Sequence, residues 1–353
     1  MPEFTWAGLT SSLIDSEDLC AEATAWAMDR VMSGETSPVV LAGFLTALAT
    51  KGETPDELRG LADSMLGHAV PVKAEGPVLD IVGTGGDRLK TVNISTMASL
   101  VIAGAGIPLV KHGNRASSSA SGSADCLESL GVNLQMPVED VERCFAELGI
   151  TFIFANVFHP SMRFAAQARR ELGVRTAFNI LGPLTNPARP STSVIGVAGE
   201  SHAPIVAGVL AERGTNALVF RGRNGMDELS AVVPNQVWEV RGGRMQFSEL
   251  DAVKDLGLAP ASVDDLRGGA ADENAEVARR ILAGEKGPVR DAVALNAAAG
   301  FVADGSLPRV HPEDGTLAER LIAGIEIAEQ TIDSGAARGL LARWVDFSAG
   351  ASA

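Results

Sequence analysis

The stretch from Asp80 to Asp125 constrains the fold of this chain more than any other part of the sequence. It contains two loops rich in glycine, serine and threonine, at 83–87 and 111–123, and each of them follows a short apolar run. Loops of this kind at the ends of strands present backbone N–H groups and hydroxyls to an anion, because no side chain blocks a close approach. Two such loops joined by one helical segment predict a ligand that carries more than one phosphate.

Short apolar strands alternate with helical segments from residue 78 onward. The strands are expected at 78–82, 107–110, 150–155, 194–198 and 217–220, with helices at 93–105, 124–130, 138–148, 159–172 and 203–213 between them. This alternation is typical of a parallel α/β sheet whose ligand loops lie at the carboxyl ends of the strands. Two further runs flanking Gly242 and Gly243 predict a hairpin, at 236–240 and 244–247. The last helical stretches are expected at 272–299, interrupted at 284–287, and at 316–333.

Residues 1 to about 70 show helical patterns only. Asp15 or Ser16 is expected to cap the first helix, and Ser37 followed by proline begins a second one. The capping box that starts at Thr54 begins a third helix, which should end near Gly67. Three short amphipathic helices bury little surface alone, so we expect them to pack against another element or another subunit.

The composition predicts a cytoplasmic enzyme of ordinary make-up. Its 353 residues correspond to about two domains, at roughly 150 residues per domain. The net charge of −15 argues against a nucleic-acid surface, because that affinity rests on Lys and Arg meeting phosphates. Cys20, Cys126 and Cys144 lack a CxxC pattern and are expected to be reduced thiols. A signal peptide is not expected, and the uncharged run 94–110 is too short and too broken by Gly and Pro for a membrane span.

The second loop is the more specific of the two. Lys111 and Arg115 supply positive charge, and the serines at 117–119 supply N–H groups and hydroxyls that could wrap a phosphate. A flexible polar surface loop is the alternative, but it would not need a strand that runs directly into Lys and His. The first loop, 83–87, lacks both the dinucleotide fingerprint and the Gly-Lys-Ser/Thr of a P-loop. A plain tight turn therefore also explains its glycines.

Charged residues further along the chain are less specific. Asp227 and Glu228 follow a strand and suit a hard cation such as Mg²⁺, although an Asp-Glu pair by itself is also typical of a solvated turn. Arg169 and Arg170, followed by an acidic residue on a predicted helix, are typical of a surface ion-pair face. The histidines expected to be structural or exposed are His68, His202 and His311.

Eight short motifs then occur in a fixed order along the chain. They are G-T-G-G-D, N-I-S-T, K-H-G-N-R-A-S-S, S-G-S-A-D, H-P-S-M, R-R-E-L-G, F-N-I-L-G-P-L-T-N-P and D-E-L-S. Together they resemble the anthranilate phosphoribosyltransferase family, and the helical start and the run D-A-V-A-L-N-A-A-A-G extend the resemblance over essentially the whole chain. The related pyrimidine-nucleoside phosphorylases share the fold but carry different glycine- and threonine-rich signatures.

The resemblance implies an α/β fold in which a small all-helical domain accompanies a larger α/β domain with a mostly parallel central sheet. The helical domain would span 1–71 and form a homodimer. The larger domain would span 76–158 and 190–353, with 159–187 crossing back to the helical domain and the site in the cleft between them.

The implied reaction joins the amine of anthranilate to C1′ of 5-phosphoribosyl 1-diphosphate and releases diphosphate, with Mg²⁺ as cofactor, in tryptophan biosynthesis. The residues implied to bind the phosphoribosyl diphosphate are Gly83, Gly86, Asp87, Thr91, Asn93, Ile94, Ser95, Thr96, Lys111, His112, Gly113, Asn114, Arg115, Ala116, Ser117, Ser118, Ser119 and Ser123. Those implied for anthranilate are Gly83, Asn114, Arg169, His112, Met162 and Gly182. The implied Mg²⁺ ligands are Ser95, Asp227 and Glu228.

Two of these implied roles also have a physical argument. Arg169 suits the substrate carboxylate, since a guanidinium binds a carboxylate through two parallel hydrogen bonds. His112 is the candidate general base, although no residue is marked by its context as an obligate one. Two departures from the family pattern concern substrate entry and the metal side. Phe158 stands where many relatives have a second histidine, and Leu-Ser-Ala-Val-Val-Pro follows Asp-Glu in place of a threonine-rich run.

Two alternatives stay open within this fold. One is a pyrimidine-nucleoside phosphorylase, and the other is a non-enzymatic homologue that binds nucleic acid. The second requires a basic groove, so the net charge of −15 and the intact Asp227–Glu228 pair argue against it.

Overall fold

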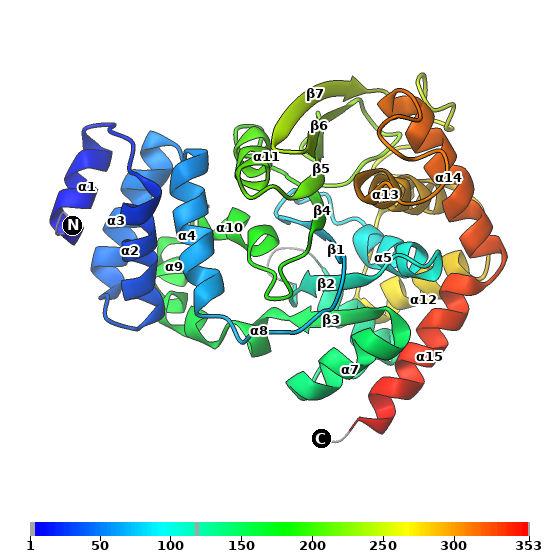
Figure 1. Ribbon diagram of the computed structural model, residues 1–353, viewed down its shortest axis with the longest axis horizontal. Helices are drawn as coiled ribbons and strands as arrows, with labels where there is room; N and C mark the ends of the chain where they lie inside the picture. The colour runs from blue at the N-terminus through cyan, green and yellow to red at the C-terminus, as the bar shows by residue number, and fades with distance from the viewer. Residues whose placement is uncertain (1–3, 117–119, 352–353) are drawn as a thin grey trace.

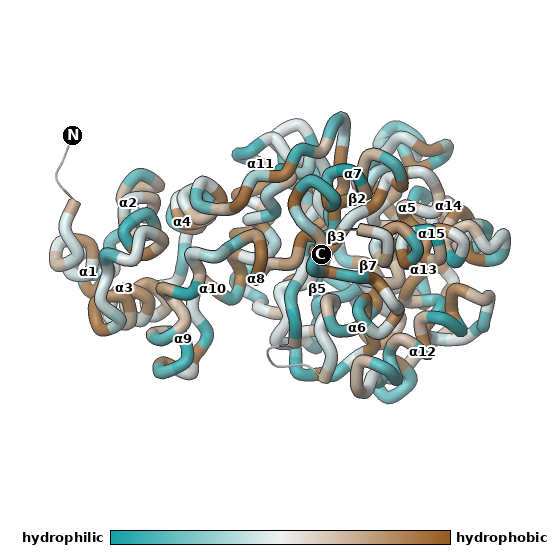
Figure 2. Tube along the Cα trace, turned by 90° about the horizontal axis from the view of Figure 1, so that it is seen from below, coloured by the Kyte–Doolittle hydropathy of each residue, from teal (hydrophilic) through white to brown (hydrophobic). Residues whose placement is uncertain are grey.

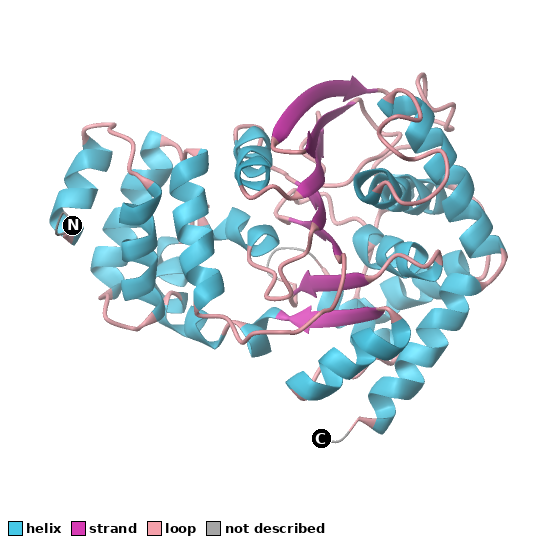
Figure 3. Cartoon of the chain, viewed as in Figure 1, coloured by secondary structure: helices cyan, strands magenta, loops and turns pink. Residues whose placement is uncertain are grey.

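The computed structural model describes residues 4–116 and 120–351, and it places a group of helices beside a larger α/β part (Figure 1). The helical part begins with α1 (Trp6–Ile14), α2 (Ala21–Met32), α3 (Pro38–Lys51) and α4 (Pro55–Gly67). Figure 3 shows the strands gathered in the other part, away from these four helices. The expected α/β fold with a small helical part is therefore confirmed.

A seven-stranded sheet forms the centre of the larger part, in the order β3-β2-β1-β4-β5-β6-β7. Its strands are β1 (Leu79–Gly83), β2 (Leu109–Gly113), β3 (Ile150–Phe154), β4 (Thr192–Gly196), β5 (Asn216–Gly222), β6 (Asn235–Arg241) and β7 (Arg244–Leu250). The first five are parallel, and β6 and β7 form the expected antiparallel hairpin. The chain moves outward from β1 to β3 and then returns to the other side of β1. Ligands bind at such a switch point, beyond the carboxyl ends of the strands.

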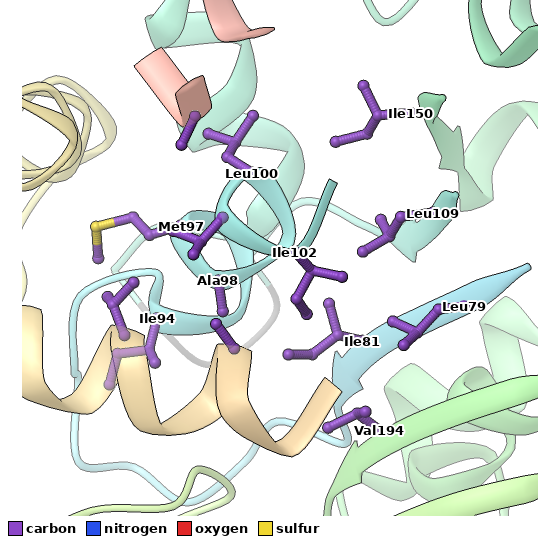
Figure 4. Close-up of a cluster of buried hydrophobic side chains, with 14 of the residues drawn as sticks. Leu79, Ile81, Ile94, Met97, Ala98, Leu100, Ile102, Leu109, Ile150 and Val194 are labelled. Atoms are coloured by element: carbon purple, nitrogen blue, oxygen red, sulfur yellow. The ribbon is translucent and has the colours of Figure 1, made fainter. Parts of the chain in front are cut away.

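The main core lies between the sheet and the helices on the side of α5 (Ile94–Gly104). Figure 4 shows Ile94, Ala98 and Ile102 of this helix among side chains from β1, β2 and β4. The helix α13 (Pro288–Asp304) comes close to α5, since a Cβ on Gly300 would lie 2.4 Å from Ile102 Cδ1. The same cluster includes residues of α6 (Ser123–Leu130), α7 (Val138–Leu148), α12 (Ala271–Leu282), α14 (Leu317–Asp333) and α15 (Ala336–Gly350). This packing fixes the first turn of α5 at the carboxyl edge of the sheet.

A second apolar cluster joins the helical part to the opposite face of the sheet. It contains Phe44 of α3, Leu58 of α4, Ile195 of β4 and Val206 of α11 (His202–Glu212). The segment 155–184 contributes to it through short elements: α8 (Ala155–Phe158), a 3-10 turn (Pro160–Phe164), α9 (Ala166–Leu172), α10 (Phe178–Leu181) and a 3-10 turn (Gly182–Leu184). Figures 1 and 2 both place α8 and α10 between the four N-terminal helices and the sheet. No helix among the described residues is long and apolar enough to cross a membrane.

Two caps expected in the helical part are confirmed. Ser37 Oγ accepts from Val40 N at 3.3 Å at the start of α3. Thr54 and Glu57 form a reciprocal capping box at the start of α4, with Thr54 N donating to Glu57 Oε2 at 2.9 Å. Each cap satisfies N–H groups that a helix start leaves free, which typically contributes ~1 kcal/mol.

Three expectations about helices are wrong. Neither Asp15 nor Ser16 begins a helix: Asp15 ends α1, Ser16 has a left-handed φ of 63°, and α2 begins only at Ala21. The single helix expected at 159–172 is a 3-10 turn followed by α9, which starts after Ala165. The helix α15 was not expected, although its buried residues Ala337, Leu340, Leu341 and Trp344 have the spacing of one helix face.

Candidate active site

The G-T-G-G-D loop follows β1 and is held against the connection after β5. Gly85 N donates to Asp227 Oδ2 at 2.6 Å, and Thr84 N donates to Gly196 O at 2.9 Å. A Cβ on Gly83 would lie 2.3 Å from Asp227 Oδ2, so no larger residue fits there without a shift. Gly85 and Gly86 both have left-handed φ angles, of 71° and 82°. The glycines thus serve a close approach between a loop and a carboxylate, which a plain surface turn would not need.

Three carboxylates gather beside this loop. Asp87, Asp227 and Glu228 each offer an oxygen, and these oxygens all lie within 4.8 Å of one another. Burial and then the charge of Asp87 raise the pKa of Asp227 to about 7, and burial together with both aspartates raises that of Glu228 well above its usual range. Asp87 Oδ2 and Glu228 Oε2 are buried without a hydrogen-bond partner among the described residues. A cluster of negative charges with free oxygens fits a hard divalent cation.

A second buried group lies on β1 and β2. Asp80 Oδ1 accepts from His112 N at 3.1 Å, and Asp80 Oδ2 accepts from Asn186 Nδ2 at 2.9 Å. Lys111 Nζ donates to Ile81 O at 2.5 Å and to Ser95 Oγ at 3.2 Å. Burial raises the pKa of Asp80 to about 6 and lowers that of Lys111 to about 8, while each charge moderates the shift of the other. Both are therefore charged near pH 7.

The side chain of His112 is buried and neutral. Its Nδ1 lies 3.1 Å from Gly182 O, so Nδ1 carries the proton and Nε2, which has no partner among the described residues, is the free acceptor. His159 lies next to it, with the ring centroids 5.1 Å apart. Burial and then the neighbouring His159 lower the pKa of His112 to about 3, and burial lowers that of His159 to about 4. Such a low pKa makes His112 a poor proton acceptor.

The second loop is tied to the helix that follows it, α6, through charge pairs. Arg115 Nη1 lies 3.0 Å from Asp125 Oδ1 and 2.5 Å from Glu128 Oε2, and Ala116 N donates to Asp125 Oδ2 at 2.9 Å. Asn93 Nδ2 donates to Ser121 O at 3.2 Å, which connects the start of α5 to this loop. Part of the positive charge expected here is thus neutralised by α6. The serines Ser117, Ser118 and Ser119 lie outside the described residues.

Arg169 reaches the same region from α9. Its guanidinium carbon lies 5.2 Å from the centroid of the Phe178 ring, and burial lowers its pKa. No carboxylate lies within ion-pair distance of it among the described residues, so the surface ion-pair face expected at 169–171 does not include Arg169. A half-buried guanidinium on an aromatic face, without a counter-charge, is suited to receive an anionic ligand.

These features surround one cavity of about 330 Å³. The predicted site residues that line it are Gly83, Gly86, Asp87, Thr91, Asn93, Ile94, Ser95, Lys111, His112, Gly113, Asn114, Arg115, Ala116, Ser123, Arg169, Gly182, Asp227 and Glu228. Thr96 and Met162 are not among its lining residues: Thr96 is fully buried, and Met162 packs against the second apolar cluster. Phe158 is buried in the main core, so its departure from the family pattern does not face the cavity.

Sequence reasoning missed lining residues that come from distant segments. Arg175 belongs to the connection between α9 and α10 and lies outside the quoted motifs, whereas Asn179 lies on α10 within F-N-I-L-G-P-L-T-N-P but was assigned no role. His202 was expected to be structural or exposed, yet it lines the cavity, and its Nε2 lies 3.4 Å from Glu53 Oε2 of the helical part. These residues lie far from the two loops in sequence, so only the fold shows that they reach the cavity.

The helical bundle, the parallel sheet and an anion-binding cavity at its switch point define a two-domain glycosyl transferase. Residues 8–69 match the model of the glycosyl transferase family, helical bundle domain. Residues 75–338 match that of the glycosyl transferase family, a/b domain.

Individual relatives show which family within this class the chain belongs to. The chain is 57% identical over 346 residues to the anthranilate phosphoribosyltransferase of Arthrobacter sp., covering 98% of this chain and 97% of that protein. It is similar to the crystal structure of the Thermus thermophilus enzyme, with 44% identity, a TM-score of 0.89 and coverage of 97% and 99%. It is also similar to the Saccharomyces cerevisiae enzyme in complex with PRPP and Mg, with 26% identity, a TM-score of 0.86 and coverage of 98% of each chain. The chain belongs to the anthranilate phosphoribosyltransferase family, as its motifs suggested.

Proposed function

We propose that this protein transfers the 5-phosphoribosyl group of 5-phosphoribosyl 1-diphosphate to the amine of anthranilate, in tryptophan biosynthesis. The observation that carries the proposal is one cavity lined by three features: a cluster of three carboxylates, a loop rich in backbone N–H groups, and a guanidinium with no carboxylate within ion-pair distance among the described residues. They correspond to Mg²⁺, to diphosphate and to an acceptor that carries a carboxylate. The named relatives favour neither a nucleoside phosphorylase nor a nucleic-acid-binding role.

The donor would lie along the carboxyl ends of β1 and β2. The residues proposed to contact it are the lining residues of 83–96 and 111–123, together with the serines at 117–119 that match the family motif. Backbone N–H groups of the glycine loop and the first turn of α5 would point at phosphate oxygens, where a helix N-terminus favours negative charge. Lys111 would supply positive charge to the donor site, because hydrogen bonds to Ile81 O and Ser95 Oγ fix the position of its ammonium group.

Ser95, Asp227 and Glu228 are proposed to hold Mg²⁺, and we add Asp87, which offers an oxygen within 4.8 Å of those of the other two carboxylates. The unpartnered oxygens of Asp87 and Glu228 are the test of fit, because they leave coordination positions free. Ser95 Oγ already accepts a hydrogen bond from Lys111, so its proposed part is to place a hydroxyl between that lysine and the metal side. When bound, Mg²⁺ would supply Lewis-acid neutralisation of the diphosphate charge. The relative from Saccharomyces cerevisiae, with PRPP and Mg bound, supports this use.

Anthranilate would enter from the side of α9 and α10. Arg169 would receive its carboxylate, and Asn114, His112, Gly182 and Gly83 would line its path. Met162 would support this path indirectly, since it packs against the second apolar cluster and does not line the cavity. The neutral rings of His112 and His159 make this side less polar than the donor side, which suits an aromatic acceptor.

The proposed chemistry is a substitution at C1′. The amine nitrogen forms a bond to C1′, the bond from C1′ to the diphosphate oxygen breaks, and that oxygen keeps the electron pair. The amine then loses one proton to solvent or to a lining group. We assign no obligate base, because the pKa of His112 is about 3 and its Nε2 would hold a proton only briefly. Positioning and electrostatic support of the leaving group are therefore the main contributions of the chain.

The assembly and location are proposed on separate grounds. We propose a homodimer formed through the helical domain, with domain limits 1–71, 76–158 and 190–353 and a returning segment 159–187. Exposed apolar residues of the helical part support it: Ile14 is 70% and Val39 is 82% exposed. We also propose that the enzyme acts in the cytoplasm, where its three cysteines, free in the structure, would stay reduced.

The decisive experiment follows the loss of anthranilate fluorescence with phosphoribosyl diphosphate and Mg²⁺. We expect loss that requires both substrates and the metal, with release of diphosphate. Turnover of thymidine with phosphate, and none of anthranilate, would overturn the proposal in favour of a phosphorylase. Salt-sensitive binding of single-stranded DNA without transferase activity would overturn it in favour of the nucleic-acid-binding alternative.

A further inference from the structure

Arg175 lies in the connection between α9 and α10, at the boundary of the helical and α/β parts. The residue that ends α9, Gly173, has a left-handed φ of 62°, so the chain turns sharply there. Three residues later Thr176 N donates to Asn179 Oδ1 at 2.9 Å, which holds the start of α10. Arg175 therefore lies in a short turn that is fixed on both sides, and not in a long loop.

The side chain of Arg175 crosses to the first phosphate-type loop. Its Nη2 donates to Gly86 O, in the middle of G-T-G-G-D. A Cβ on Gly86 would lie 3.0 Å from Arg175 Nη2 and 3.5 Å from its Cζ. The guanidinium therefore occupies space that the missing side chain of Gly86 leaves open. The two positions fit each other although they lie 89 residues apart in sequence.

This contact holds the loop from the side opposite to its other anchors. Gly85 N bonds to Asp227 and Thr84 N bonds to Gly196, and both of those partners belong to the α/β part. Arg175 comes instead from the segment that packs with the helical part. The loop is thus held between the two parts of the molecule, and its position depends on how they approach each other.

Arg175 forms no ion pair among the described residues, but its charge acts on a nearby carboxylate: burial raises the pKa of Asp87, and Arg175 moderates that shift. Arg115 pairs with Asp125 and Glu128, whereas no carboxylate of the described residues lies within ion-pair distance of Arg175. A guanidinium presents several N–H groups in a planar fork, so one can bond Gly86 O while others face an anion in the cavity. A lysine at this position would keep the charge but not the fork.

We propose that Arg175 is a positioning residue for the phosphorylated donor, which fixes the G-T-G-G-D loop from the helical side and adds positive charge beside it. The inference rests on the proposed function, since it assigns the residue to the donor side of that same cavity. Binding of the donor and approach of the two parts are thereby linked through one side chain. The acceptor side, which belongs to Arg169, does not need this contact.

The test uses the full-length enzyme with Arg175→Ala and Arg175→Lys, and Arg163→Ala as the matched control. Arg163 is exposed, belongs to the same segment and does not line the cavity. For Arg175→Ala we expect the KM for phosphoribosyl diphosphate to rise about 10- to 100-fold, the range for losing a hydrogen bond to a charged group. The KM for anthranilate and the melting temperature should stay close to those of the wild type. Arg175→Lys should fall between, and Arg163→Ala should match the wild type.

A second measurement separates positioning from packing. Free guanidinium at millimolar concentration should restore part of the activity of Arg175→Ala and have no effect on Arg163→Ala. Equal rises in both KM values with a lower melting temperature, or an unchanged KM for the donor, would overturn the inference. The wild type is assayed first: absence of anthranilate turnover there would remove the proposed function itself, whereas an active wild type with an indifferent Arg175→Ala would remove only this role.

Discussion

Two groups of buried ionisable side chains lie at the same edge of the sheet, and their charges are balanced in opposite ways. In the first group both carboxylate oxygens of Asp80 accept hydrogen bonds, and Lys111 supplies an opposite charge. The second group, Asp87, Asp227 and Glu228, has only negative charges and leaves two buried oxygens without partners among the described residues.

The difference separates a group that stabilises the fold from a group that is proposed to bind a cation. The first group is complete in the protein alone and fixes Lys111 and His112, two adjacent residues of β2. The second group is stable as an ionised cluster only when a cation is added, because like charges in a buried site raise each other's pKa. Substitutions should therefore affect stability at one group and activity at the other.

The largest effect is expected from Asp227→Asn combined with Glu228→Gln. Because both changes remove charge from the cluster, Mg²⁺-dependent turnover should fall by about 1,000-fold or more. The melting temperature in EDTA should hold or rise, since buried like charges are removed. Anthranilate fluorescence measured across a Mg²⁺ titration, with thermal melting alongside, checks both statements. A normal response to Mg²⁺ would dismiss the metal site.

Asp80→Ala should instead lower the stability of the fold. It leaves His112 N and Asn186 Nδ2 without their acceptor and Lys111 without its opposite charge. Breaking a buried charged network in this way typically costs about 3–5 kcal/mol. Urea unfolding monitored by circular dichroism measures it, with Asp80→Asn as the control that keeps an acceptor. A loss below ~1 kcal/mol in Asp80→Ala would show that the group does not stabilise the fold.

The donor side of the cavity could be predicted from sequence because its signals are local. The runs 83–87 and 111–115 each follow a strand, and Asp227 and Glu228 follow another, so periodicity and turn residues together point to one edge of a parallel sheet. The family resemblance then supplied Arg169 on the acceptor side, where residue patterns alone indicated a surface ion pair.

The remaining contacts depend on tertiary structure. Asn186 bonds Asp80 across 106 positions and Arg175 bonds Gly86 across 89, and neither pairing has a local pattern. Asp87 was assigned to the donor, and only the packing of Gly83 and Gly85 against Asp227 brings it to the metal side. The helix α1 was not expected, and the start of the next helix was placed at Asp15 or Ser16 although α2 begins only at Ala21; Ser16 adopts a left-handed conformation that its residue type does not require.

Arg169 is a further charged group without an ion-pair partner among the described residues, but its charge is positive. If its role is to receive the acceptor carboxylate, Arg169→Ala should raise the KM for anthranilate about 10- to 100-fold and leave that for phosphoribosyl diphosphate nearly unchanged. Arg170→Ala, the exposed neighbour on α9, is the control. Steady-state fluorescence with each substrate varied in turn measures the two constants. Equal losses for both substrates would argue against the assigned role.

The smallest effect concerns pH, and it compares the wild type with the Asp227→Asn, Glu228→Gln variant in EDTA. The folded-state pKa of Asp227, about 7, is above its ordinary 3.8, so its contribution to stability is greatest below the ordinary value and is lost as pH rises through 7. The stability of the wild type relative to the variant should therefore fall by about 1 kcal/mol between pH 6 and pH 8, or roughly 2–4 °C in melting temperature. His112 and His159 also titrate abnormally, but they are common to both proteins and cancel in the difference. Lys111 is common to both as well, but it interacts with Glu228, so its shift is part of the measured difference. Saturating Mg²⁺ should remove or reverse the fall in the wild type, because metal binding favours the ionised carboxylates. A difference that stays constant over this range would show that the cluster is already ionised without a cation, and the contrast between the two buried groups would not hold.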